Sequence, residues 1–170
     1  VTLTANGDDE SLQLFVLPDG ADLSPYVSLK SGEEALSLSD SGMILTRNAA
    51  DLLGVDANDE ITVKTSALDE ATVPIAHVAD NYLGNAAYLT QSAYEQLFDE
   101  EVQPNGFYLA LSGNDTEKEA FADSLAERSE FLSVSSTQQM NEEFSKSFDL
   151  INTIVYVIVF LAAALAFVVL

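Results

Sequence analysis

Hydrophobic and polar positions divide the chain into a patterned region that ends at Asp149 and an uncharged apolar run from Leu150 to Leu170. A helix crosses the hydrocarbon of a bilayer in about 20 residues at about 1.5 Å per residue. No polar stripe follows Thr153, although a helix with one side in water would carry one. We therefore predict a membrane-spanning helix over 151–170, with a buried core helix of a soluble protein as the alternative.

Short apolar runs between turn signals predict strands in the patterned region. The sequence LQLFVLP predicts a strand that ends at Pro18, and NGDDE predicts a turn before it. Residues 25–42 predict a short strand pair or an extended arm. The segment GMILTRNAADLLGVDANDEITV predicts a strand, a short helix that Thr46 caps and Gly54 ends, and a returning strand. Further strands are predicted over 71–80, 87–89 and 104–113, and a short one over 131–134.

Helical spacing appears three times after Leu89. Thr90 or Ser92 caps a predicted helix, and Thr116 with Glu119 fits the reciprocal capping pattern of a second. The third begins near Gln138 and contains no helix breaker up to Leu170. Its apolar face consists of Met140, Phe144, Phe148 and Ile151, at steps of four, four and three. We predict that this amphipathic helix continues into the membrane span as one rod of about 50 Å.

The predicted fold is α+β, with mixed small sheets and short helices followed by a long helix that enters a transmembrane span. The predicted organisation is an extracytoplasmic α+β domain over 1–137 in one or two lobes, a juxtamembrane amphipathic helix over 138–150, and a truncated transmembrane helix over 151–170. The chain starts at Val1 without a signal pattern, and its apolar run stops at Leu170 without a flanking base. We therefore expect an excised piece of a longer membrane protein.

Charge restricts the partners. The chain carries 28 acids and 6 bases, a net charge of -22, so nucleic acid and anionic membrane surfaces are poor partners. Lys146 is the only base within about 20 residues before the predicted span, which places the soluble part outside the cytoplasm by the positive-inside rule. A high-salt habitat is a competing cause of the acidity. The absence of cysteine excludes disulfides and thiolate metal sites.

Candidate chemistry is sparse, and we predict no catalytic residue, no cofactor and no metal site. His77 is the single histidine, and we place it on the face of Val73 and Ile75 as a packed core or edge residue. Asp56, Asn58 and Glu60 alternate as calcium ligands would, but Ile61 replaces the glycine of a calcium loop. A solvated turn is the preferred interpretation there.

Two segments carry a resemblance to a known family. The first, ILTRNAADLLGVDANDEITV, matches the ILT...A..LGV..GD.ITV pattern, with Asn58 in place of a glycine. The second, DNYLGNAAYLTQSAYEQLF, matches ENYxGHxxYMxxxxYExxF, with Asn85 in place of a histidine. These segments, followed by a long helix, resemble the extracytoplasmic domain of FtsX-like, MacB-type ABC transporter permeases. The resemblance covers roughly residues 12–170.

The resemblance implies a non-catalytic permease subunit of the cell membrane that couples helix movement, driven by a cytoplasmic ABC ATPase, to its outer domain. Transport or mechanotransmission would then act on a peptide, lipid, lipoprotein or extracytoplasmic protein cargo. A single-pass sensor or adhesion ectodomain is the alternative, and a membrane-anchored hydrolase is a third interpretation. The weak candidates for a contact loop are Tyr82, Gly84, Asn85 and Tyr88. The competing interpretation is that the tyrosines pack the sheet.

Overall fold

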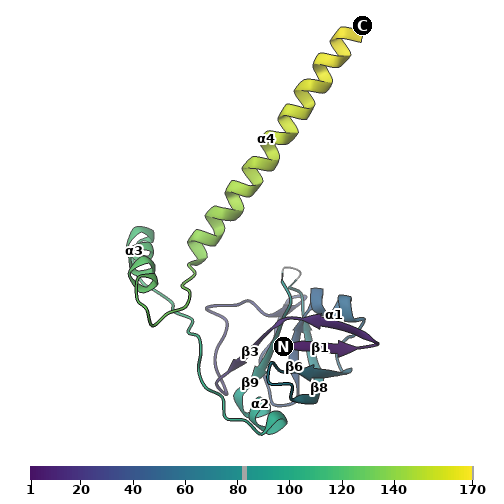
Figure 1. The fold of residues 1–170 in the computed structure, drawn as a ribbon, viewed down its shortest axis with the longest axis vertical. Helices are drawn as coiled ribbons and strands as arrows, with labels where there is room; N and C mark the ends of the chain where they lie inside the picture. Colours follow the sequence, from purple (N-terminus) through teal and green to yellow (C-terminus); the bar gives the residue numbers. More distant parts are fainter. Residues whose placement is uncertain (82–83, 170) are drawn as a thin grey trace. The chain divides into compact units, whose positions relative to one another are not determined.

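The computed structural model describes residues 1–81 and 84–169 (Figure 1), with only the backbone of residues 143, 144, 164, 166, 168 and 169. The chain divides into two compact units, Val1–Ala110 and Leu111–Leu170. The first contains a curled mixed sheet with short helices, and the second contains two helices. The predicted α+β class, ending in a long apolar helix, is confirmed.

Seven strands of the first unit form one mixed sheet in the order β2-β1-β7-β8-β6-β9-β3. Their bounds are β1 Thr2–Ala5, β2 Asp8–Ser11, β3 Gln13–Leu17, β6 Met43–Thr46, β7 Glu60–Lys64, β8 Glu70–Ala79 and β9 Ala86–Thr90. Only Leu12 separates β2 from β3, although these strands are the two ends of the order. The sheet therefore curls until its two end strands are halves of one extended run.

The turn predicted at NGDDE and the region predicted as a strand pair or extended arm over 25–42 each contain a hairpin. Asn6 and Gly7 join β1 to β2 with φ of 53° and 93°, the positive values that a two-residue hairpin turn requires. Strands β4 (Lys30–Ser31) and β5 (Glu34–Ala35) pair antiparallel within the 25–42 region. The strand pair predicted there is confirmed.

The strand, helix and returning strand predicted over 43–63 are confirmed as β6, α1 (Arg47–Leu53) and β7. Gly54 ends the helix in the left-handed conformation at φ 62°. Thr46 occupies the N-cap position, but its side chain makes no cap hydrogen bond. Its hydroxyl lies on the strand side instead, donating to the Gly84 carbonyl at 3.4 Å and accepting from the Ala86 N–H at 3.1 Å. The cap role predicted for Thr46 is therefore wrong.

Strand β8 changes its inward face at a bulge. Met43 pairs with Ile75 and the next residue, Ile44, pairs with His77, so Ala76 is an extra residue in β8. Val73 and Ile75 are buried before the bulge, whereas His77 after it is exposed. The prediction that His77 shares their face is wrong, because strict alternation does not continue across the bulge.

Two apolar clusters fill the opposite faces of the sheet. The first contains Leu3, Met43, Leu45, Leu53, Ile61, Val63, Val73, Ile75 and Leu89 among its buried residues. The second contains Leu29, Ile44, Ala79 and Tyr88, with Phe15 and the aliphatic side chains of the 23–38 region packed against it.

Thr90 caps helix α2 (Gln91–Phe98), because its hydroxyl accepts from the Ala93 N–H at 3.2 Å. Thr90 is one of the two caps predicted for this helix.

The segment predicted as a strand over 104–113 has no regular secondary structure. Phe107 and Leu109 are 76% and 59% exposed, and Tyr108 makes the ring contacts of this segment. The short strand predicted over 131–134 is also absent, and Leu132 is fully exposed. An alternating pattern forms a strand only where a neighbouring strand pairs with it, and none among the described residues does so here.

The second unit contains α3 (Asp115–Ala126) and α4 (Thr137–Val169). Asn114 and Glu117 form the reciprocal cap of α3, so the capping pair predicted at Thr116 and Glu119 lies two residues too late. The uninterrupted helix predicted from Gln138 is confirmed. Within the described residues, α4 is the one helix long and apolar enough to cross a membrane.

Candidate functional site

The predicted contact loop leads into β9, and its residue Asn85 makes hydrogen bonds to three other elements. The Asn48 side-chain amide donates to the Asn85 amide oxygen, and the Asn85 side chain donates to Glu10 at 3.4 Å. The Asn85 carbonyl accepts from the Gln13 N–H at 3.3 Å. These bonds join the start of β9 to α1, β2 and β3. Tyr82 lies outside the described residues.

Tyr88 packs against the sheet and does not form part of an open loop. It is 6% exposed, and its ring stacks on Phe15 with centroids 5.2 Å apart. Burial, followed by the charge effect of Tyr108, raises the pKa of its phenol. Of the two interpretations of this tyrosine, the structure favours packing.

The aromatic contacts continue to the surface. Tyr108 lies 6.2 Å from Phe15 and 5.7 Å from Tyr26 between ring centroids. Tyr26 and Tyr108 are 43% and 47% exposed, so they form an accessible aromatic edge beside the buried pair. The sequence did not indicate this grouping, because its members lie far apart in the chain and in segments of different type.

A concave surface of about 500 Å³ lies between the two limbs of the 21–38 region. Its larger apolar lining residues are Leu23, Val27, Leu29, Leu36 and Leu38, and its charged lining consists of Asp22 and Lys30. Two hydrogen bonds from Ser24 hold the pKa of Asp22 below its usual range. The bond from the Ser24 side chain has the larger effect and the bond from its backbone has the smaller. This lining suits contact with an apolar group better than proton transfer.

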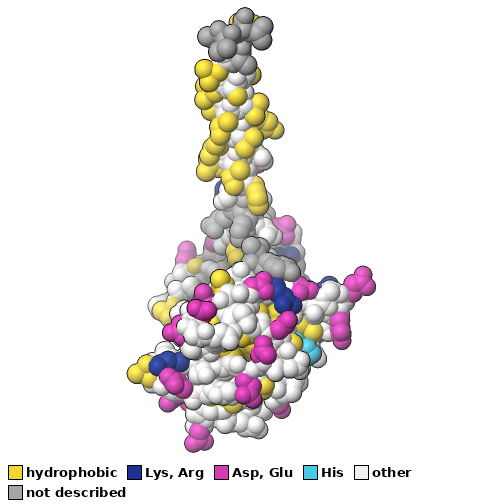
Figure 2. Space-filling view, turned by 90° about the vertical axis from the view of Figure 1, so that its right-hand side faces the viewer, with side chains coloured by type: hydrophobic (Ala, Val, Ile, Leu, Met, Phe, Trp, Pro, Cys, Tyr) yellow, Lys and Arg dark blue, Asp and Glu magenta, His cyan; other side chains and the backbone are white. Residues whose placement is uncertain are grey.

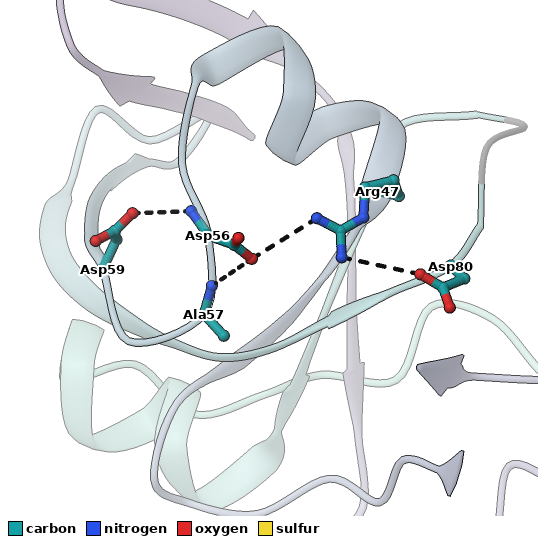
Figure 3. Close-up of polar contacts among 5 residues, drawn as sticks. All are labelled: Arg47, Asp56, Ala57, Asp59 and Asp80. Carbon is teal, nitrogen blue, oxygen red and sulfur yellow. Dashed lines mark hydrogen bonds and ion pairs between the residues drawn. The ribbon is translucent and has the colours of Figure 1, made fainter. Parts of the chain in front are cut away.

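Arg47 forms a charged junction that the sequence did not indicate (Figure 3). At the first position of α1, its guanidinium lies 3.6 Å from Asp56 and 3.8 Å from Asp80. Asp80 also accepts from the Gly32 N–H at 2.6 Å, which ties the β4-β5 hairpin to the end of β8. The Arg47 side chain is 24% exposed, and both carboxylates also accept a backbone N–H, so this junction is structural.

In the DAND turn, the aspartate carboxylates accept hydrogen bonds from backbone N–H groups of the same turn. Asp59 accepts from the Asp56 N–H at 2.8 Å, and Asp56 accepts from the Ala57 N–H at 2.9 Å. Asn58 has φ 74°, which fits a tight turn. Within the part of the chain that the structure describes, no group of three or more His, Cys, Asp or Glu side chains is placed to hold a metal ion.

The apolar side chains of α4 that the structure describes are exposed on all sides of the helix. Met140, Phe148 and Ile151 are 50%, 64% and 54% exposed, while the side chain of Phe144 lies outside the description. Further along, Tyr156 and Phe160 are 75% and 73% exposed. In Figure 2 hydrophobic side chains cover much of the upper part of α4, whereas acidic side chains are spread over the visible face of the sheet unit.

This composition and exposure indicate membrane association for α4. The stretch Thr137–Ala163 has a window of mean hydropathy 1.6, and none of that window is buried. A helix that is apolar all round needs either a protein core or lipid around it.

No protein-family model matches the chain, and no curated protein matches its sequence.

Proposed function

We propose that this chain is the extracytoplasmic domain of an FtsX-like, MacB-type ABC transporter permease subunit with an adjoining membrane helix. In this function a separate cytoplasmic ATPase supplies the energy, and the permease couples helix movement to the outer domain. The cargo class is a peptide, lipid or lipoprotein. The proposal assigns no catalytic residue to this chain.

The continuity of α4 carries the proposal. The helix runs for 33 residues, Thr137–Val169, and its last charged residue is Asp149. Its charged first part and its apolar second part therefore belong to one hydrogen-bonded rod of about 50 Å. A rod without glycine or proline transmits displacement, because each such interruption would weaken the helix by about 1 to 3 kcal/mol and absorb motion.

Two further features support it. The first of the two segments that carry the family resemblance folds as β6, α1 and β7, and most of its apolar side chains lie in the first cluster. Lys146 is the one base in α4, so the sequence before the apolar part lacks the basic cluster typical of cytoplasmic loops. This supports an outer position for the sheet unit.

The test uses the complete membrane protein with its ATPase, purified together in nanodiscs. Phe148→Gly with Ile151→Gly introduces flexibility into the rod at two positions on one face. We expect basal ATP hydrolysis to remain and its stimulation by cargo to fall at least about fivefold, since two glycines cost about 2 kcal/mol of helix stability.

The matched control is Phe148→Ala with Ile151→Ala, which removes the same side chains and keeps a good helix former. Coupling should survive in the alanine pair. Equal coupling in both pairs would refute the rod function. If no ATPase copurifies and the sheet unit still binds an outer ligand, the chain is a single-pass sensor or adhesion ectodomain.

A further inference from the structure

The dipeptide Asn-Gly occurs twice in the chain, at Asn6-Gly7 and at Asn105-Gly106. Asparagine is a chemically labile residue, and a following glycine makes it more so, because glycine has no side chain to hinder attack by its backbone nitrogen. Both asparagines and both glycines are exposed to solvent. Sequence and exposure therefore do not distinguish the two sites, and a difference in reactivity must come from how the fold holds each asparagine.

The reaction is spontaneous deamidation, which needs water and no catalyst. The glycine backbone nitrogen attacks the side-chain carbonyl carbon Cγ of the asparagine and forms a bond with it. The bond from Cγ to Nδ2 breaks, and the amide group leaves as ammonia with the proton of the glycine N–H. Water then opens the resulting cyclic imide at either carbonyl, which leaves aspartate or isoaspartate. Ring closure requires rotation of both the side chain and the backbone, so a held asparagine must first be released.

Asn6 is held at its side chain and at its backbone. Its side-chain amide, which contains the leaving group, donates to the Leu53 carbonyl at 3.0 Å and to the Gly54 carbonyl at 2.9 Å. Its backbone lies in the turn of the β1-β2 hairpin with φ of 53°, and the pairing of Ala5 with Asp8 closes that turn. The hydrogen bonds and the turn must open before Asn6 reacts.

Asn105 is held at neither position. It lies within residues 99–114, which contain no helix or strand. Among the described residues, none hydrogen-bonds to the Asn105 side chain or to the Gly106 N–H, which is the attacking group. No atom lies within 4 Å of a Cβ placed on Gly106, so nothing packs against the glycine either. The reactive conformation is therefore accessible without opening any part of the fold.

We propose that Asn105 is a site of spontaneous deamidation in the folded protein, and that the hairpin turn and the bonds to the end of α1 protect Asn6. The product replaces a neutral amide with a carboxylate, which adds negative charge to a stretch that already contains Glu100 and Glu101. The isoaspartate form also lengthens the main chain shortly before Tyr108. This site is independent of the proposed transport function, since the reaction requires neither ATP nor an ATPase.

The test incubates the full chain in nanodiscs at mildly alkaline pH, in water that carries a heavy oxygen isotope. Peptide mapping by mass spectrometry follows each asparagine, and the isotope marks the molecules that react during the incubation. We expect deamidation of Asn105 to be at least about tenfold faster than that of Asn6, because only Asn6 needs a local opening of the fold. In urea that unfolds the sheet unit, where neither asparagine is held, the two rates should agree within about threefold.

Gly106→Ala tests the mechanism at Asn105. The variant should keep the fold, because no atom lies within 4 Å of the added Cβ and φ at Gly106 is outside the left-handed region. The new methyl group hinders attack by the backbone nitrogen of residue 106, so deamidation of Asn105 should slow at least about tenfold. Deamidation of Asn6 in the same sample is the internal control and should not change. Asn105→Asp provides the standard that separates aspartate from isoaspartate in the peptide map.

The proposal is overturned if Asn105 and Asn6 react at equal rates in the folded protein, or if Asn105 reacts only after unfolding. It is also overturned if the ratio of the two rates is the same in urea, since the neighbouring residues and not the fold would then determine it. An unchanged rate at Asn105 in Gly106→Ala would exclude attack by the backbone nitrogen.

Discussion

The rings of Phe15 and Tyr88 stack with centroids 5.2 Å apart and planes inclined by 15°, across the parallel pairing of β3 with β9. The two residues are directly opposite in register, so the ring contact and the backbone pairing reinforce each other. This relationship holds β3 beside β9 and gives Tyr88 a packing role.

Truncating Tyr88 should therefore destabilise the sheet unit. We expect Tyr88→Ala to lower the free energy of unfolding by about 3 kcal/mol, because it removes a buried ring and leaves a cavity beside Phe15. Tyr88→Phe retains the ring and should cost less than about 1 kcal/mol. Urea unfolding followed by circular dichroism measures both values. A similar loss in the two variants would mean that the hydroxyl, not the stacking, is the important group.

Gly42 provides a second stability test, because its backbone lies against β8. A Cβ atom placed on Gly42 would meet the Pro74 carbonyl oxygen at 2.3 Å, and φ there is +155°. We expect Gly42→Ala to cost more than about 2 kcal/mol, since either β6 or β8 must shift. Thermal and urea unfolding measure this cost.

Gly32 is the matched control for Gly42. It also has a positive φ, +61°, but nothing lies within 4 Å of an added Cβ. Gly32→Ala should therefore cost about 1 kcal/mol, the penalty for the conformation alone. Equal costs at the two glycines would show that the contact with Pro74 relaxes freely.

The correctly predicted elements are those whose signals, such as apolar runs, caps and turn residues, lie within a short stretch of sequence. The β6-α1-β7 unit follows from an apolar run, a helix of seven residues and Gly54 in the left-handed conformation, all within 22 residues of sequence. The cap at Thr90 and the hairpin turn at Asn6 and Gly7 are equally local. Such signals do not require knowledge of a distant neighbour.

The features that sequence reasoning missed depend on distant neighbours. The Thr46 side chain does not cap α1, because its hydroxyl bonds to the backbone of Gly84 and Ala86. The bulge opposite Met43 and Ile44 moved His77 to the exposed side of β8. Arg47 pairs with Asp56 and Asp80 because the fold places these residues close together. Their spacing along the chain does not indicate the pairing.

Asp19 should give the sheet unit a pH-dependent contact. Ser92 donates to the Asp19 carboxylate through its hydroxyl and through its N–H, the latter at 3.0 Å. Both bonds lower the pKa of Asp19, and the hydroxyl bond has the larger effect. A group whose pKa is lower in the folded state stabilises that state above its unfolded pKa, and this contribution disappears as pH falls through the folded pKa.

We therefore expect the difference in unfolding free energy between the natural chain and Asp19→Asn to be largest above about pH 5 and to shrink below about pH 4. Ser92→Ala, which removes the hydroxyl donor, should reduce the same pH dependence. Urea unfolding at several pH values provides the measurement. A difference that stays constant from pH 7 to pH 3 would exclude the Asp19 carboxylate as the titrating group.

The membrane association of α4 is testable by one charge placed in its apolar part. Val159 is 59% exposed and ten residues beyond Asp149, the last charged position of the helix. A lysine near the centre of a span costs about 2.5 to 3.5 kcal/mol for insertion. Val159→Lys should therefore lower the fraction of chain that resists alkaline extraction from membranes, and Ser145→Lys, in the charged part of α4, should leave that fraction unchanged. If α4 were instead a soluble helix covered by protein, the natural chain would itself be extracted, and Val159→Lys would reduce folding stability without changing the distribution between membrane and buffer.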